Sequence, residues 1–122
     1  MAVSVVGEIE MPESPSHRRL KNRDAGINGR TEYTLPSGRR LDALSPTKIA
    51  VEIERGGPNS IRKSVSSLKE ATAVGIARKA RLRVPEWNLD IAYDEMRRQR
   101  LGGELTNLGG TTKIDVPKKR RG

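Results

Sequence analysis

Residues 49–55, Ile-Ala-Val-Glu-Ile-Glu-Arg, alternate between apolar and polar side chains. Side chains two positions apart on an extended strand point to the same face of a sheet, so the three β-branched residues share one face. The same alternation places Glu52 and Glu54 together on the other face. The stretch is therefore predicted to be a β-strand that carries a pair of carboxylates on one side.

Two further strands are predicted before this one. Residues 31–35 carry β-branched and aromatic side chains and end at the turn Pro36-Ser37-Gly38, and residues 39–44 continue the chain beyond that turn. Ser45-Pro46-Thr47-Lys48 then turns the chain into the strand at 49–55. The three strands are predicted to form an antiparallel meander.

Helices flank this meander. Apolar residues at helical spacing predict a helix from about residue 60 into the mid-seventies, followed by a short strand at 81–84 that should run parallel to one meander strand. A basic helix over 17–23 is predicted before the meander, and a last helix over 89–100 closes the series. The predicted fold class is α/β (α+β), a small mixed sheet flanked by helices.

The chain of 122 residues is long enough for one domain. Residues 1–16, which are acidic and rich in Pro and Ser, are predicted to be a linker-like leader, and 17–101 the folded domain. Residues 102–122 are rich in Gly and Thr and end in Lys118-Lys119-Arg120-Arg121, so they are predicted to be a flexible basic tail.

Composition excludes several kinds of chemistry. Without cysteine there is no disulfide, no thiolate nucleophile and no cysteine-ligated metal, and a single histidine removes any mechanism that needs a histidine pair. His17 is predicted to be exposed in its basic helix, and Trp87 to anchor the last helix on the sheet. Catalysis would rest on carboxylates with a hard divalent cation.

The charge balance points to a polyanionic partner. Lys and Arg number 24 against 15 Asp and Glu, which gives a net charge of +9. Residues 1–16 hold three Glu and no Lys or Arg, so the rest carries +12. No apolar run is long enough to cross a membrane, so the expected partner is DNA or RNA and not a membrane. No signal peptide is recognised, so the expected site of action is cytoplasmic.

A third carboxylate joins the pair on the central strand. Asp42 lies on the neighbouring hairpin strand, so it can reach Glu52 and Glu54 and form a cluster of oxygens for Mg²⁺ or Mn²⁺. A cation held there would activate water against a phosphodiester. Basic residues near these acids in sequence are the predicted nucleic-acid contacts: Arg39, Arg40, Arg55, Arg62 and Lys63.

The register of the hairpin decides whether this cluster forms. A loop of two or four residues pairs Asp42 with Val51 and turns the Asp42 side chain to the apolar face. A loop of three or five residues, or a bulge, pairs Asp42 with Glu52 instead. The metal site requires the second register, and the alternation alone leaves both open.

An Asp, a hairpin, Glu-x-Glu on an alternating strand and a following helix resemble the PD-(D/E)xK nuclease superfamily over residues 16–100. The resemblance implies a restriction-endonuclease-like αβββαβ core, Asp42 and Glu52 as metal ligands, and a Mg²⁺- or Mn²⁺-dependent endonuclease in which Asp42, Glu52 and Glu54 are catalytic. The sequence departs from the family at Glu54, where a Lys is usual. Lys63 or Lys69 of the following helix is the predicted substitute.

The resemblance has further implications for partners. Compact basic nucleases of this superfamily also occur as toxin modules of bacterial competition systems, which would imply a cognate inhibitor protein. The sequence does not distinguish a monomer from a homodimer. The alternative function is that of a non-catalytic, basic nucleic-acid-binding protein.

Overall fold

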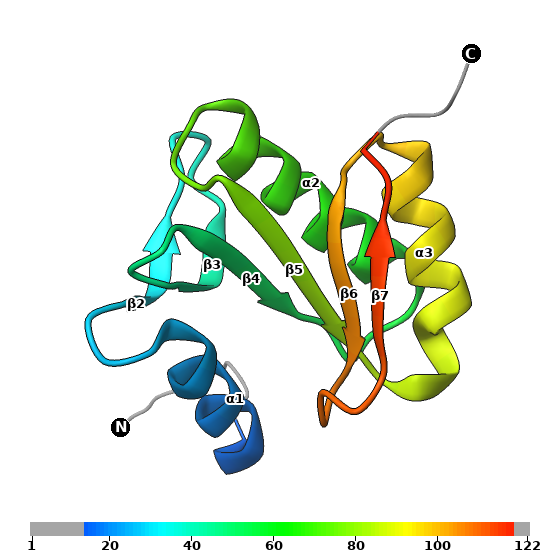
Figure 1. Ribbon diagram of the computed structural model, residues 1–122, viewed down its shortest axis with the longest axis horizontal. Helices are drawn as coiled ribbons and strands as arrows, with labels where there is room; N and C mark the ends of the chain where they lie inside the picture. The colour runs from blue at the N-terminus through cyan, green and yellow to red at the C-terminus, as the bar shows by residue number, and fades with distance from the viewer. Residues whose placement is uncertain (1–13, 119–122) are drawn as a thin grey trace, which may run out of the picture.

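A computed structural model of the chain describes residues 14–118 as three α-helices and a six-stranded sheet (Figure 1). The protein is a mixed α/β fold, as predicted. Its elements, in chain order, are α1 (Pro15–Ala25), β2 (Arg30–Thr34), β3 (Arg40–Leu44), β4 (Ile49–Ile53), α2 (Pro58–Ala73), β5 (Lys79–Val84), the short 3₁₀-helix η1 (Glu86–Asn88), α3 (Leu89–Arg98), β6 (Gly103–Asn107) and β7 (Lys113–Val116).

The strands lie in the sheet in the order in which they occur in the chain, β2-β3-β4-β5-β6-β7. Strands β2, β3 and β4 form the predicted antiparallel meander. Helix α2 then crosses over to β5, which runs parallel to β4 with Ile49 opposite Lys79, so the prediction of a parallel fourth strand is confirmed. Strand β6 is parallel to β5, and β7 returns antiparallel to β6.

Helices cover both faces of the sheet. The larger core lies between the sheet and helices α2 and α3, where Ile61, Leu68 and Met96 meet Leu82 of β5. A smaller core lies on the opposite face beneath α1, where it contains Ala25, Ala43, Val51 and Ile53. The apolar face predicted for the central strand is therefore the face that α1 covers.

The prediction of a flexible tail over 102–122 is wrong for most of that segment. Residues 103–116 form β6 and β7, and Leu105 and Val116 are buried in the larger core. The folded domain therefore extends well beyond residue 101. Residues 119–122, like residues 1–13 of the predicted leader, lie outside the described residues.

The close approach of β6 to β5 depends on Gly103. Its φ of 150° is an uncommon conformation for other residues, and a Cβ there would lie 2.5 Å from the carbonyl oxygen of Ala80. The glycine that suggested a linker in the sequence is therefore needed for strand packing.

Helix α1 begins earlier than predicted. The hydroxyl of Ser14 accepts a hydrogen bond from the backbone N–H of His17 (3.1 Å) and caps the helix, with Pro15 as its first residue. Pro15 and Ser16 consequently belong to the helix and not to the leader.

Candidate active site

The hairpin between β3 and β4 has the register that brings the two predicted metal ligands together. Ala43 lies opposite Val51 and Leu44 opposite Ala50. The loop has three residues, 46–48, closed by the hydrogen bond from the backbone N–H of Ser45 to the carbonyl of Ile49 (3.0 Å). Continued by one residue, this register places Asp42 opposite Glu52.

The carboxylates of Asp42 and Glu52 replace the ladder hydrogen bonds where β3 and β4 separate. The backbone N–H of Asp42 donates to Glu52 Oε2 (3.0 Å), and the backbone N–H of Ile53 donates to Asp42 Oδ2 (2.7 Å). Each side chain thus binds the backbone of the opposite strand. The two carboxylates are held side by side, with one oxygen of each committed to the backbone.

The position of this pair works against its ionisation. Burial raises the pKa of Asp42, and the N–H of Ile53 and the charges of His17 and Lys21 counter that rise only in part. For Glu52, which is 8 % exposed, burial and then the charge of Asp42 raise the pKa well above its usual range. Two neighbouring carboxylates with raised pKa values form a site that a cation would stabilise.

Helix α1 contributes two basic side chains to this site. His17 and Lys21 lie one turn apart on the same helix face. His17 Nε2 lies 3.8 Å from Asp42 Oδ1, and the charge of Lys21 lowers the pKa of Asp42. His17 is half-buried and not exposed as predicted. The i, i+4 spacing of the two residues was the one sequence signal that they act together.

Glu32 of β2 lies beside Asp42 of β3, and its backbone conformation is strained. Its φ is 57°, although it is neither glycine nor at a turn, and the ladder pairs Thr31 and Tyr33 but omits Glu32. Its carboxylate forms ion pairs with Lys21 and with Arg40 Nη1, the latter at 3.3 Å. Glu32 therefore ties α1 to β3 next to Asp42.

Glu54, the predicted third acid, is bound to the turn after β4 and to helix α2. Its Oε2 accepts the backbone N–H of Gly56 (2.8 Å), and its Oε1 accepts the Ser64 hydroxyl (2.9 Å). It still influences the site, because its charge adds to the raised pKa of Glu52. Within residues 14–118, no three Asp, Glu or His side chains converge closely enough to enclose a metal ion.

The predicted nucleic-acid contacts are dispersed. Arg40 is ion-paired with Glu32, and Arg55 Nη2 donates to Ser16 Oγ (3.2 Å), one residue before His17 on α1. Of the others, Arg39 is exposed at the tip of the β2–β3 hairpin, and Arg62 and Lys63 are exposed on α2. Lys69, which was predicted with Lys63 as a substitute for the family's Lys, donates from Nζ to the carbonyl of Gln99 beside α3 (2.5 Å).

An ion network that the sequence did not reveal holds α1 on the sheet. Asp24, at the end of α1, accepts two hydrogen bonds from Arg83 of β5 (2.7 and 2.8 Å) and one from Arg81 (3.0 Å). Arg83 also donates to Thr106 (3.2 Å), and Arg81 is paired with Glu104. The bonds from Arg83 to Asp24 raise the pKa of Arg83. The network fixes the helix that carries His17 and Lys21.

Trp87 is 80 % exposed, so the prediction that it anchors α3 is wrong. It belongs to η1, which Asn88 attaches to the turn after Glu54 through a hydrogen bond from Nδ2 to the carbonyl of Gly56 (3.1 Å). The Trp87 ring is therefore exposed to solvent on η1, next to this turn.

No helix within residues 14–118 is long and apolar enough to cross a membrane. Comparisons of the chain with protein-family models, with curated proteins and with solved structures found no match.

Proposed function

We propose that the protein is a divalent-metal-dependent nuclease whose centre is the Asp42–Glu52 pair. The observation that carries the proposal is the mutual anchoring of these two carboxylates where β3 and β4 separate. A structural role alone would not require two acids to lie together with raised pKa values. The order α1-β2-β3-β4-α2-β5 supports the resemblance to the PD-(D/E)xK core.

The donor set suits Mg²⁺ or Mn²⁺. Both ions prefer carboxylate oxygens, and Mg²⁺ is commonly held by one or two carboxylates together with water and substrate phosphate. Asp42 Oδ2 and Glu52 Oε2 bind backbone N–H groups, and Glu52 also has a hydrogen bond with Ser64, so the cation is assigned to the remaining lone pairs of the two carboxylates. Such a cation supplies Lewis-acid activation of the phosphodiester and of water.

The cationic side chains have the remaining roles. In the superfamily that the chain resembles, a Lys is usual at the position that Glu54 occupies here. We assign the role of that Lys to Lys21 of α1, because the charge of Lys21 acts on Asp42. His17 lies close enough to Asp42 to exchange a proton with water at the site. We assign the phosphates of the nucleic-acid strand to Arg40, which is ion-paired with Glu32, and to Arg55, which donates to Ser16 beside His17.

Cleavage assays on supercoiled plasmid DNA and on total tRNA test this proposal. We expect one of the two polymers to be cut in Mg²⁺ or Mn²⁺ and neither to be cut in EDTA, because the acid pair needs a cation. Intact polymers in both metals would contradict the proposal. Binding without cleavage would favour the alternative of a non-catalytic nucleic-acid-binding protein.

A further inference from the structure

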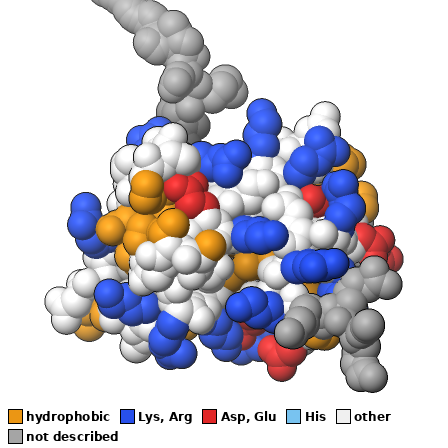
Figure 2. Space-filling model, turned by 90° about the horizontal axis from the view of Figure 1, so that it is seen from above, with side chains coloured by type: hydrophobic (Ala, Val, Ile, Leu, Met, Phe, Trp, Pro, Cys, Tyr) orange, Lys and Arg blue, Asp and Glu red, His pale blue; other side chains and the backbone are white. Residues whose placement is uncertain are grey.

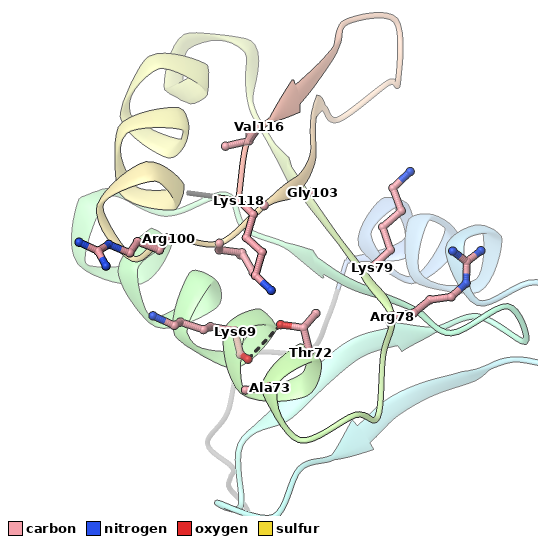
Figure 3. Close-up of a pocket in the computed structure, with 11 residues that line it drawn as sticks. Lys69, Thr72, Ala73, Arg78, Lys79, Arg100, Gly103, Val116 and Lys118 are labelled. Atoms are coloured by element: carbon pink, nitrogen blue, oxygen red, sulfur yellow. Dashed lines mark hydrogen bonds between the residues drawn. The ribbon is translucent and has the colours of Figure 1, made fainter. Parts of the chain in front are cut away.

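A basic hollow of about 400 Å³ lies at the end of the molecule opposite the acid pair (Figure 3). The acid pair is at the end of β4, whereas the hollow is at the starts of β5 and β6, beside the C-terminal ends of α2 and α3. Among residues 14–118, five cationic side chains line it: Lys69, Arg78, Lys79, Arg100 and Lys118. No Asp or Glu of the described part of the chain lines it.

These five cations come from parts of the chain far apart in sequence. Because β5 and β6 are parallel, their starts bring together the end of α2, the α3–β6 connection and the residues after β7. In Figure 3, Lys118 extends from beyond β7 toward Lys69 and Thr72 of α2. Figure 2 looks onto this end and shows Lys and Arg side chains spread across it.

The charge of this hollow is not neutralised by any carboxylate that the structure describes. Elsewhere, Lys21, Arg81 and Arg83 are each paired with an acid, but no ion pair within residues 14–118 involves any of the five cations. Lys69 and Arg78 are held in place by backbone carbonyls, those of Gln99 and Thr47. Like charges gathered at one place repel one another, so an anion bound there would lower the free energy of this end of the molecule.

We propose that this hollow binds the phosphate backbone of a nucleic-acid strand. Sites for free nucleotides usually hold phosphate with backbone N–H groups at the N-terminus of a helix. The helix ends at this hollow are the C-termini of α2 and α3, whose carbonyls disfavour an anion deep inside. Cations on flexible side chains around the rim suit phosphates that pass along a surface.

Binding at the hollow does not depend on nuclease activity. Arg39, Arg40, Arg55, Arg62 and Lys63, the contacts predicted from sequence, are all outside the hollow. The hollow therefore adds a second contact region at the far end of the sheet. If the proposed nuclease centre is wrong, binding at the hollow remains; if the hollow does not bind, cleavage at the acid pair is still testable with EDTA and metal.

The test is binding of a fluorescent oligonucleotide, measured by anisotropy in EDTA over about 50 to 200 mM salt. The variant is Lys79→Glu with Lys118→Glu, and the matched control is Arg18→Glu with Arg19→Glu, which makes the same charge change on exposed residues that are outside the hollow and are not among the predicted contacts. We expect the hollow variant to weaken binding about tenfold and to lower the salt slope by about 2. Equal weakening by both doubles would overturn the proposal.

Two further arms keep the result unambiguous. The first is the neutral double variant Lys79→Gln with Lys118→Gln, which the fold accommodates more easily than charge reversal. It should weaken binding less than the Glu variant does, and unchanged binding would count against the hollow. Pyrophosphate and ATP are added as competitors. If the competitors displace the oligonucleotide no more than the added ionic strength does, the ligand is a nucleic-acid strand. Strong displacement would overturn the proposal in favour of a free polyphosphate.

Discussion

Asp42→Asn and Glu52→Gln should each reduce cleavage by about a hundredfold or more and, at the same time, stabilise the fold. The loss of activity follows from removing a ligand charge at the centre. The gain in stability follows from burial, which raises the pKa of both carboxyls and so penalises their charged forms at neutral pH. The expected gain is about 1 kcal/mol, or about 4 °C in Tm.

The stabilisation by Glu52→Gln should depend on pH. A carboxyl whose pKa is raised on folding favours the native state below its unfolded pKa, and that contribution is lost as the pH rises through the folded pKa. Glu52→Gln should therefore change stability little below pH 4.5, the ordinary value for Glu, and should stabilise increasingly above it.

Thermal unfolding of wild type and variants across acidic and neutral pH measures this effect. Asp94→Asn, a change of an exposed carboxylate on α3, is the matched control and should change neither cleavage nor Tm. A Glu52→Gln protein that is less stable than wild type at neutral pH would show that the pair is structural.

Asp24→Ala should destabilise the protein by about 3 to 5 kcal/mol, because it leaves Arg83 and Arg81 without their shared carboxylate. The side chain of Asp24 is only 2 % exposed, so water cannot replace it at low cost. Urea unfolding measures the loss, with Asp94→Ala as the exposed control. A loss no larger than that of the control would mean that the network contributes little to holding α1.

The part of the site built from neighbouring strands could be predicted from the sequence. Alternation along 49–55 indicated which face of β4 is apolar, and Asp42 was recognised as the acid able to reach Glu52. Their pairing could not be decided, because it depends on a three-residue loop in which Lys48 adopts a φ of 69°. A Lys is an unusual residue for that conformation, so composition gave no sign of it.

The parts that depend on distant residues could not be predicted. Strand β6 carries Glu104 and Thr106, which are buried only because Arg81 and Arg83 of β5 satisfy them. A polar, glycine-flanked segment therefore suggested a tail. Helix α1 was underestimated for the same reason, since Asp24 finds its partners more than fifty residues away.

Calorimetric titration of Mn²⁺ into wild type, Asp42→Asn and Asp94→Asn tests the central claim most directly. We predict that wild type and Asp94→Asn bind Mn²⁺ and that Asp42→Asn, though folded, loses most of that binding. Equal binding by all three proteins, or none by wild type, would contradict the assignment of Asp42 and Glu52 as a divalent-metal centre.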